Sequence, residues 1–300
     1  MVVAGPTASG KTALSIRLAE HFQSEIISFD SRQFYREMPI GTAAPDAAQR
    51  SRVRHHFIGD RSCTSPLNAG EYEREATPLL QRLFERHPIL IAVGGSGLFL
   101  QALTEGFDDM GPSDQGEARL YWSDFFRTHG LAALQNELRQ RDPAYAAVAD
   151  LNNHQRLIRA LEVVQLTGRP YSEHRKGRKT ERPYRLCLLG LNPPRALLHQ
   201  RIEQRVHRMI EAGLENEAHL LYPLRHLKSL QTVGYTEWFQ HFEGRLLRQE
   251  VAEQILFHTR SYARRQITWF RKKNGIRWFE REDDGDIIPY IEQQSEWNGR

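Results

Sequence analysis

The segment Gly5-Pro6-Thr7-Ala8-Ser9-Gly10-Lys11-Thr12 contains residues of the types, and at the spacing, that bind phosphate groups. It fits the pattern G-x-x-x-x-G-K-[ST], in which a glycine-rich loop follows a strand and opens a helix. The glycines let backbone N–H groups surround an anion, the lysine adds a positive charge, and the threonine hydroxyl is a ligand for Mg²⁺. We therefore expect a phosphorylated ligand, with Mg²⁺ at Thr12, bound by Gly5, Thr7, Ala8, Ser9, Gly10, Lys11 and Thr12. The pattern does not identify this ligand.

Asp30 is a second candidate, because it closes the apolar run 25–30 and begins the segment DSRQFY. A carboxylate at the carboxyl end of a strand, beside a phosphate loop, can hold Mg²⁺ through water or accept a proton from a nucleophile. Asp is also a leading residue at helix N-caps, so it could instead cap a following helix. The spacing alone leaves both interpretations open.

Two further segments carry weaker signals. The turn Gly94-Gly95-Ser96-Gly97 lets the backbone and the Ser96 hydroxyl approach a ligand, but a single glycine-rich turn has low specificity. The pair His55-His56 has no third ligand at metal-binding spacing, which favours a loop or structural position over a metal site.

Cationic residues are concentrated in two stretches near the C-terminus. The helix expected after Pro194 carries Arg201, Arg205 and Arg208, and one such arginine could reach a leaving diphosphate. In the stretch 260–273, cations alternate with aromatic residues. That combination suits a nucleic-acid backbone with bases to stack on, and it equally suits a charged helix face with a buried aromatic stripe.

The elements that must position these residues follow an alternating pattern of short apolar runs and amphipathic helices. This pattern predicts an α/β fold like that of P-loop NTPases, a parallel sheet with helices on both faces. The expected strands are 1–4, 25–30, 88–93, 184–191 and 276–279. Because ligands collect at the carboxyl ends of such strands, the phosphate loop, Asp30 and the glycine turn should meet at one edge.

The strand signal disappears between residues 112 and 177, where helical patterns replace it. Gly168 and Pro170 are stop signals for a helix that carries Leu157, Leu161 and Val164. The sequence therefore predicts a core domain built from 1–111 and 178–300, and an all-helical insertion domain over 112–177.

Composition limits the class of protein. The chain has 300 residues, 40% of them apolar, and a net charge of +4, which permits an anionic partner without requiring one. Its two cysteines form no disulfide framework or zinc motif, so a reducing cytoplasm fits best. No apolar run approaches the ~20 residues of a membrane span, so no membrane partner is expected. We expect a monomer.

Taken in order, these segments resemble the bacterial tRNA dimethylallyltransferases, also called tRNA isopentenyltransferases. The resemblance extends nearly from end to end and is more specific than the phosphate loop alone. It rests on GPTASGKT at Gly5, DSRQFY at Asp30, GTAAP at Gly41, HHFIGD at His55, VGGSGLFLQAL at Val93, QRLIRALEV at Gln155, RIEQRVHRMIEAGL at Arg201, QTVGY at Gln231 and YARRQITWFR at Tyr262.

The resemblance implies transfer of a dimethylallyl group from dimethylallyl diphosphate to N6 of adenosine 37 in the anticodon loop of tRNA. The phosphate loop would then hold the donor's diphosphate, with Arg205 and Mg²⁺ assisting. Asp30 would act as the general base, Ser96 would lie at the reacting centre, and Lys11 would stabilise the leaving group. The implied tRNA contacts are Asp30, Ser31, Arg32, Gln33, Gln155, Arg156, Arg159, Arg264, Arg265, Gln266 and Trp269, with the helical insertion binding tRNA.

The chain departs from the family pattern at two positions. Ser96 stands where Thr is usual, which keeps the hydroxyl, and Ala44 replaces the usual Lys. Two other functions fit part of the sequence. An ATP-dependent small-molecule kinase would use the same loop and sheet, but it does not explain the basic aromatic C-terminus. A nucleotide-switched RNA-binding module would need no catalytic Asp30.

Overall fold

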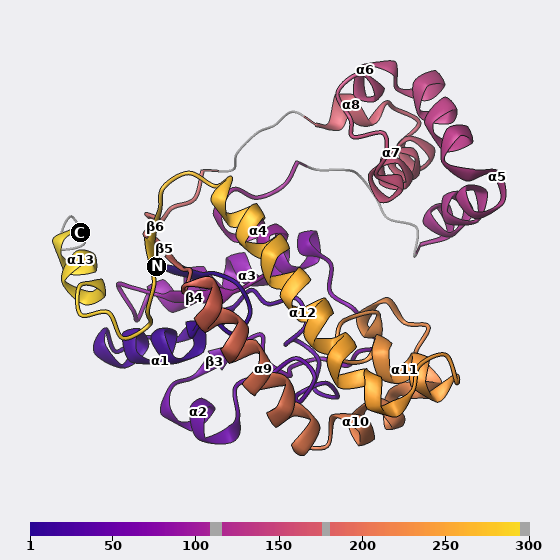
Figure 1. Ribbon diagram of the computed structural model, residues 1–300. Helices are drawn as coiled ribbons and strands as arrows, with labels where there is room; N and C mark the ends of the chain where they lie inside the picture. Colours follow the sequence, from indigo (N-terminus) through magenta and orange to yellow (C-terminus); the bar gives the residue numbers. More distant parts are fainter. Residues whose placement is uncertain (109–115, 176–180, 295–300) are drawn as a thin grey trace. The chain divides into compact units, whose positions relative to one another are not determined.

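The computed structural model describes residues 1–108, 116–175 and 181–294 (Figure 1). The chain divides into two compact units. The first is formed by Met1–Thr104 together with Arg182–Arg300, and the second by Glu105–Glu181. The sequence segments expected to link them, near residues 111 and 178, lie largely outside the described residues.

A six-stranded sheet forms the centre of the first unit, and every strand pairing in it is parallel. The strand order is β3-β2-β4-β1-β5-β6. The strands are β1 (Val2–Ala4), β2 (Ile26–Ser28), β3 (His55–His56), β4 (Ile91–Gly94), β5 (Leu188–Leu191) and β6 (Ile276–Phe279). The predicted α/β fold with a parallel sheet is therefore confirmed, and β1, which leads into the phosphate loop, lies between β4 and β5.

Helices enclose this sheet. The first stretch of the chain contributes α1 (Lys11–His21), α2 (Ala47–Arg52), α3 (Ala69–Phe84) and α4 (Gly97–Thr104). The second stretch contributes α9 (Arg195–Glu211), α10 (Leu214–Leu221), α11 (Thr236–Phe242), α12 (Arg248–Arg271) and α13 (Ile287–Gln293), with short 3₁₀ turns at Tyr222–Leu224 and Lys228–Leu230. Both stretches are needed to cover the sheet.

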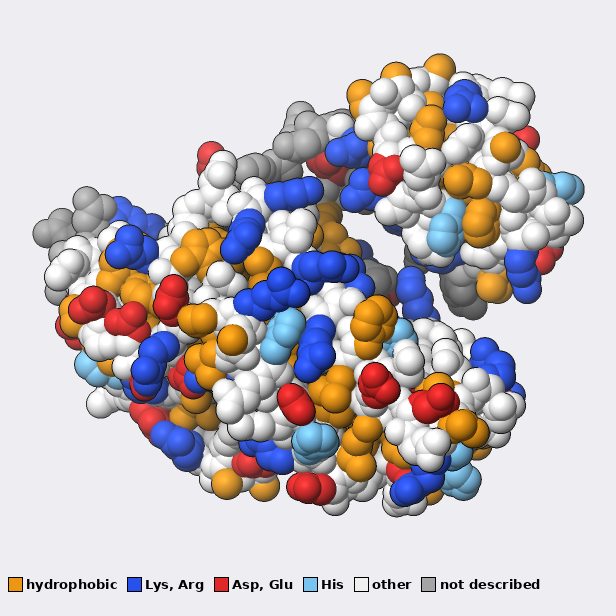
Figure 2. All heavy atoms as spheres, viewed as in Figure 1, with side chains coloured by type: hydrophobic (Ala, Val, Ile, Leu, Met, Phe, Trp, Pro, Cys, Tyr) orange, Lys and Arg blue, Asp and Glu red, His pale blue; other side chains and the backbone are white. Residues whose placement is uncertain are grey.

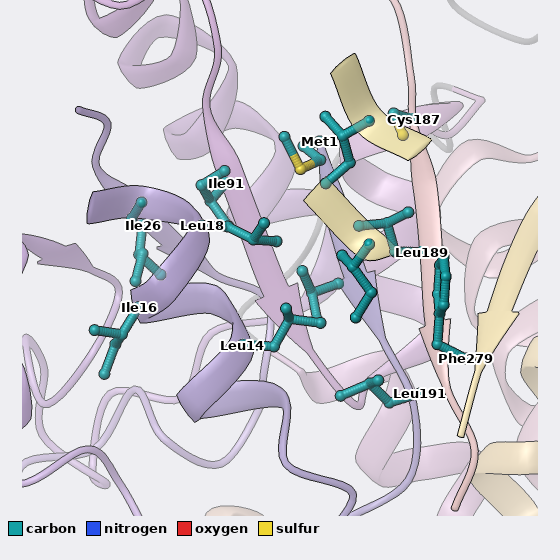
Figure 3. Packing of buried hydrophobic residues seen from close by; sticks show 14 of the residues in the cluster. Met1, Leu14, Ile16, Leu18, Ile26, Ile91, Cys187, Leu189, Leu191 and Phe279 are labelled. Atoms are coloured by element: carbon teal, nitrogen blue, oxygen red, sulfur yellow. The ribbon is translucent and has the colours of Figure 1, made fainter. Parts of the chain in front are cut away.

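The main core lies between α1 and the central strands. Leu14 and Leu18 of α1 pack with Val3 of β1 and with Leu189 and Leu191 of β5, all of them buried (Figure 3). Alternate residues of a strand point to opposite faces of a sheet, so the apolar runs in β1 and β5 serve both faces. This packing fixes β1 and the start of α1, the two elements that hold the phosphate loop.

The second unit is helical in its described part. It contains α5 (Glu117–Arg141), α6 (Pro143–Ala146), α7 (His154–Thr167) and α8 (Tyr171–His174). Its own buried cluster includes Trp122, Leu138, Leu157 and Leu161. The stop signal at Gly168 acts as expected, because this residue caps α7 in the left-handed conformation, with φ of 68°.

Two details of the secondary structure differ from the sequence prediction. The strands expected from residues 88 and 184 begin at Ile91 and Leu188, because the preceding residues form no ladder. His55–His56, expected as a loop or structural segment, forms a two-residue strand at the sheet edge that pairs with Ile26 and Ile27. A strand of two residues is too short to show a period of two in sequence.

Candidate active site

The phosphate loop connects β1 to α1, and its geometry requires its glycines. Gly10 has φ of 94°, in the left-handed region, and a Cβ there would lie 2.6 Å from the Glu282 carboxyl carbon. Gly5 has φ of 148°, and a Cβ there would lie 2.5 Å from the Leu191 carbonyl oxygen. Any side chain at either position would be strained and would collide with its neighbour. The loop is thus held tightly against β5 and the segment that follows β6.

A pocket of about 450 Å³ opens in front of this loop, at the carboxyl ends of the central strands. Its lining brings together the loop, Asp30 and the arginines of α9, which come from three distant parts of the sequence. The predicted site residues that line it are Thr7, Ala8, Ser9, Gly10, Lys11, Thr12, Asp30, Arg32, Gln33 and Arg205. Val206, Met209, Val233 and Ile255 give the same pocket an apolar part.

Two cations lose solvation in this pocket. Burial lowers the pKa of Lys11 to about 7; Asp30 opposes this change and Arg205 adds to it. The Lys11 ammonium donates a hydrogen bond to the Pro6 carbonyl at 2.6 Å. Burial also lowers the pKa of the Arg205 guanidinium, and Asp30 again opposes it. One carboxylate thus faces two desolvated cations, a charge balance that favours binding of an anion.

Thr7 is held by the protein at both of its polar groups. Its backbone N–H donates to Gln266 Oε1 at 2.8 Å, and its hydroxyl oxygen accepts from Arg205 at 2.7 Å. The backbone N–H of Thr7 is therefore used within the protein, whereas its hydroxyl hydrogen can still donate to a phosphate oxygen, and Thr7 lines the pocket. The remaining loop residues Ala8 to Thr12 still line the pocket.

Asp30 follows β2 and is half-buried at the pocket wall. Its Oδ1 accepts a hydrogen bond from the backbone N–H of Arg32 at 3.1 Å, which fixes the carboxylate in a turn. The interpretation of Asp30 as a helix N-cap is wrong, because turns follow it and the next helix begins only at Ala47. The carboxylate is thus available to the pocket.

Ser96 lies beside the segment that carries Asp30. Its hydroxyl accepts from the backbone N–H of Ser31 at 3.0 Å and donates to the Ser31 hydroxyl at 3.0 Å. It also shares a hydrogen bond with the Tyr262 hydroxyl. Burial raises the pKa of Tyr262, and the nearby Asp30 carboxylate raises it further, so the phenol stays protonated at neutral pH. Ser96 thus links the glycine turn to both Ser31 and α12.

Tyr262 is a site residue that the sequence reasoning did not select. It belongs to the YARRQITWFR segment, where only the cations, Gln266 and Trp269 had been chosen. Its position four residues before Gln266 puts both on one face of α12, which is the signal that could have identified it. The spacing relates the two residues to each other, but the partners of the helix are needed to show that their face turns toward the site.

Arg32 and Gln33 use part of their hydrogen-bonding capacity within the protein. Arg32 donates to the Ser229 carbonyl at 2.9 Å and to the Lys228 carbonyl at 3.3 Å. The Gln33 amide donates to the carbonyls of Thr42 and Ala43 at 3.2 and 3.1 Å. They tie the turn after Asp30 to neighbouring loops, while both still line the pocket.

The structure separates the residues of α12 into two groups. Arg264 and Arg265 are exposed, and Lys and Arg side chains gather along this helix in Figure 2. Gln266 is only 6% exposed and points inward, and Trp269 packs its ring against the backbone of Gly97. Both ends of the Gln266 amide bond to protein in this structure, so the expected contact of Gln266 with RNA stays a prediction that this geometry does not support.

A second hollow of about 390 Å³ adjoins the pocket and shares Arg32, Thr232, Val233 and Tyr262 with it. Its other lining residues include Ser31, Arg265 and the pair Glu237 and His258. It therefore lies between the turn after Asp30 and the exposed cations of α12.

The other candidates for tRNA contact lie on α7 in the second unit. Gln155 and Arg156 are exposed, and Arg119 donates to the side-chain Oε1 of Gln155 at 3.0 Å. Arg159 forms an ion pair with Glu162 at 2.9 Å. These three residues all lie on α7 of the second unit.

The oxygen atoms near the loop suit Mg²⁺. Thr12 and Asp30 both line the pocket, and a hydroxyl with a carboxylate is a donor set that Mg²⁺ accepts alongside phosphate oxygens and water. Over the described ranges, no group of three His, Cys, Asp or Glu side chains is arranged to hold a metal ion. Within the same ranges, no helix combines the length and apolar character needed to cross a membrane.

The sequence of this chain is similar to members of one protein family. Residues 33–273 match the family model of IPP transferases. The chain is 44% identical over 279 residues to tRNA dimethylallyltransferase 2 of Azobacteroides pseudotrichonymphae, covering 93% of this chain and 91% of that protein. It is 43% identical to tRNA dimethylallyltransferase of Christiangramia forsetii, with 97% of each chain covered.

Two solved structures are also similar. The tRNA isopentenylpyrophosphate transferase of Bacillus halodurans has 35% sequence identity and a TM-score of 0.70, with 99% of this chain and 95% of that one covered. A eukaryotic dimethylallyltransferase acting on tRNA has 26% identity and a TM-score of 0.80, covering 98% of this chain and 76% of that one.

Proposed function

The chain belongs to the IPP transferase family, and the relatives that it resembles along most of its length are tRNA dimethylallyltransferases. We therefore propose that it transfers a dimethylallyl group from dimethylallyl diphosphate to N6 of adenosine 37 of tRNA. The observation that carries this proposal is a single pocket that joins the phosphate loop to Asp30 and to an apolar wall. A hollow next to it offers a place for the nucleoside.

The donor end of the reaction uses the loop. The diphosphate lies against the backbone N–H groups of Ala8 to Thr12, at the start of α1, and the Lys11 and Arg205 cations meet its charge. The five-carbon group then packs on the apolar residues Val206, Met209 and Ile255. Mg²⁺, held at Thr12, would neutralise part of the diphosphate charge when it is bound.

The acceptor end uses Asp30 as a general base. An exocyclic adenine amine is a weak nucleophile, so removal of its proton as the N–C bond forms lowers the barrier. The N6–C bond forms, the C–O bond to diphosphate breaks, and the proton passes to the Asp30 carboxylate. Ser96 and Tyr262 lie next to Asp30, where their hydroxyls can orient the adenine. The adenine reaches these hydroxyls by leaving the base stack of the single-stranded anticodon loop, which costs little free energy.

The lowered pKa of Lys11 gives a pH dependence for donor binding. The side chain is charged below pH about 7 in the free protein and neutral above it. A bound diphosphate favours the charged form, so binding takes up a proton above pH 7. We expect the dissociation constant of dimethylallyl diphosphate to rise with pH above 7, by up to about tenfold per pH unit. Isothermal titration calorimetry in buffers of different ionisation enthalpy measures both the affinity and the proton uptake.

The Lys11→Arg variant is the control for this pH profile, because its guanidinium stays charged over the whole pH range. The ionisation of the diphosphate itself affects the dissociation constant equally in both proteins. The slope attributable to Lys11 is the difference between the two proteins. Equal slopes would contradict a Lys11 that titrates near neutrality.

The exposed cations of α12 are proposed to meet RNA phosphates. Replacing Arg264, Arg265 and Arg271 together by Gln should weaken tRNA binding and flatten the plot of log affinity against log salt by about two units for the three lost contacts. Filter binding between low and moderate salt measures the slope. The control removes three exposed arginines around α3, at positions 74, 82 and 86, and should leave it unchanged. An unaltered slope in the α12 variant would assign these arginines to a solvated face.

A direct assay separates the transferase from an ATP-dependent kinase. The protein is incubated with Mg²⁺, labelled dimethylallyl diphosphate and unmodified tRNA, with ATP as the competing donor. We expect label in the RNA and little inhibition by ATP. Phosphate transfer from ATP, with no label in the RNA, would favour the kinase.

The second unit, including Gln155, Arg156 and Arg159, is proposed as a further tRNA-binding surface.

A further inference from the structure

Gln266 joins two loops of the site that are distant in sequence. Its amide oxygen accepts from the Thr7 backbone N–H at 2.8 Å, and its amide nitrogen donates to the Gly95 carbonyl at 2.9 Å. Thr7 belongs to the phosphate loop, and Gly95 belongs to the turn that carries Ser96. One buried side chain therefore sets the separation between the donor side and the acceptor side of the pocket.

The connection continues beyond Gln266. The hydroxyl of Thr7, whose N–H is held by Gln266, accepts from the Arg205 guanidinium at 2.7 Å. Hydrogen bonds thus run from the Gly95 carbonyl through Gln266 and Thr7 to Arg205. At one end, the Gly95 carbonyl belongs to the peptide bond that joins Gly95 to Ser96. At the other end, the Arg205 guanidinium is a desolvated cation that lines the pocket.

The surroundings leave this connection little freedom. Gln266 is 6% exposed, and a Cβ added to Gly95 would overlap the Gln266 amide nitrogen. A shorter or apolar side chain at 266 would leave a buried carbonyl and a partly buried N–H without these partners, a costly arrangement that loosens both loops. The close approach of the Gly95 backbone to Gln266 is possible only with a glycine at position 95. This requirement has a clear purpose if the glutamine must occupy position 266.

We propose that Gln266 and Thr7 form a positioning relay that holds the Gly95-Ser96 turn and the Arg205 guanidinium in register, so that the attacking amine and the leaving diphosphate are aligned. This inference rests on the proposed function. Gln266 lines neither of the two hollows, so its effect is exerted through Thr7 and Gly95. A misplacement of about 1 Å in such a site is enough to cost on the order of 100-fold in rate.

The test is a double-mutant cycle on turnover, measured with the full chain. Gln266→Leu removes both bonds of the amide, and Thr7→Val removes the hydroxyl that receives Arg205. We expect kcat to fall about 100-fold in Gln266→Leu and to fall clearly in Thr7→Val, and in both variants to fall by a larger factor than the affinity for inorganic diphosphate does. The double variant should be no slower than the slower single variant, because both act in one relay. Losses that multiply would overturn the proposal.

Conservative variants and a matched control separate positioning from simple stability. Thr7→Ser keeps the hydroxyl and should restore most of the rate lost in Thr7→Val. Gln266→Glu keeps an acceptor for Thr7 but loses the donor to Gly95, so it should remain slow even where it folds normally. Gln249→Leu makes the same substitution at an exposed position of α12 and should have wild-type kcat. Full kcat in a folded Gln266→Glu would overturn the relay.

A readout without turnover distinguishes this proposal from the proposed function. Hydrogen exchange is followed in the segments 5–12 and 94–97 of wild-type protein and of the Gln266 variants. Loss of the relay should speed exchange in both segments together, whatever reaction the protein catalyses. If wild-type protein transfers no label to tRNA, the proposed function fails while the exchange data still judge the relay. Unchanged exchange in either segment would refute it.

Discussion

Asp30→Asn should lower the rate of dimethylallyl transfer by about 10³-fold, within the usual range for loss of a general base. The carboxylate is fixed by the Arg32 N–H and faces the pocket beside Lys11, so the asparagine amide keeps the volume but loses the proton acceptor. Single-turnover assays with labelled donor and saturating tRNA measure the step directly. Binding of tRNA and of diphosphate should survive, because the loop and the arginines are intact.

The matched control for this variant is Asp60→Asn, which changes an exposed aspartate of the same unit that pairs with Arg61. It should transfer the prenyl group at the wild-type rate. Undiminished turnover in Asp30→Asn would remove Asp30 from the proton-transfer step, and an equal loss in both variants would point to general damage to the unit.

Arg205→Ala should lower kcat by about 10²- to 10³-fold, the range seen when one preorganised donor to developing charge is removed. The guanidinium is desolvated, lines the pocket and is oriented by Thr7, so it meets the diphosphate as the C–O bond breaks. The loss should appear in kcat more than in donor affinity, because the charge on the bridging oxygen grows in the transition state. Rapid-quench kinetics and calorimetry of diphosphate binding separate the two.

Arg195→Ala is the comparison for Arg205→Ala, since Arg195 is exposed at the first turn of the same helix. It should leave kcat unchanged. If Arg205→Ala raises only the dissociation constant of the donor, its contribution is ground-state binding and the leaving-group assignment is wrong.

The parts of the site that lie within one short segment were predictable from sequence. The phosphate loop carries its own pattern, and Asp30 stands at the end of an apolar run, so the common direction of parallel strands and the local chemistry are enough to place them at one edge. The parallel sheet followed from the alternation of apolar runs and helices. None of these inferences needed a partner from elsewhere in the chain.

The arginines of α9 show what the sequence could not decide. Arg201, Arg205 and Arg208 recur at helical spacing on one face of α9 and all line the pocket, so periodicity cannot choose among them and only packing decides what each one contacts. Arg201 pairs with Glu282 and also donates to the Ser9 carbonyl of the loop at 3.4 Å, Arg208 is exposed, and Arg205 is the one of the three that bonds to the Thr7 side chain. The choice of Arg205 as the leading candidate rested on resemblance, and helical periodicity by itself could not have made it.

The inward position of Gln266 is a second example. A glutamine between Arg265 and Ile267 in a basic helix has the composition of a nucleic-acid contact. Its burial depends on the close approach of the Gly95 backbone to α12, a tertiary feature with no local signal. Residues whose partners lie more than 150 positions away, as Gly95 does from Gln266, are recognised only when the fold is known.

The discontinuity of the first unit has a consequence for biosynthesis. Strand β1 is flanked by β4 from the same stretch and by β5 from the stretch after residue 181. A nascent chain leaving the ribosome therefore exposes one side of its central strand until the later stretch emerges, at about 5–20 residues per second. The helical unit in between has its own apolar cluster and can fold during that interval. Chaperone binding should peak before Arg205 and Gln266 are translated, and anion binding should appear only after both.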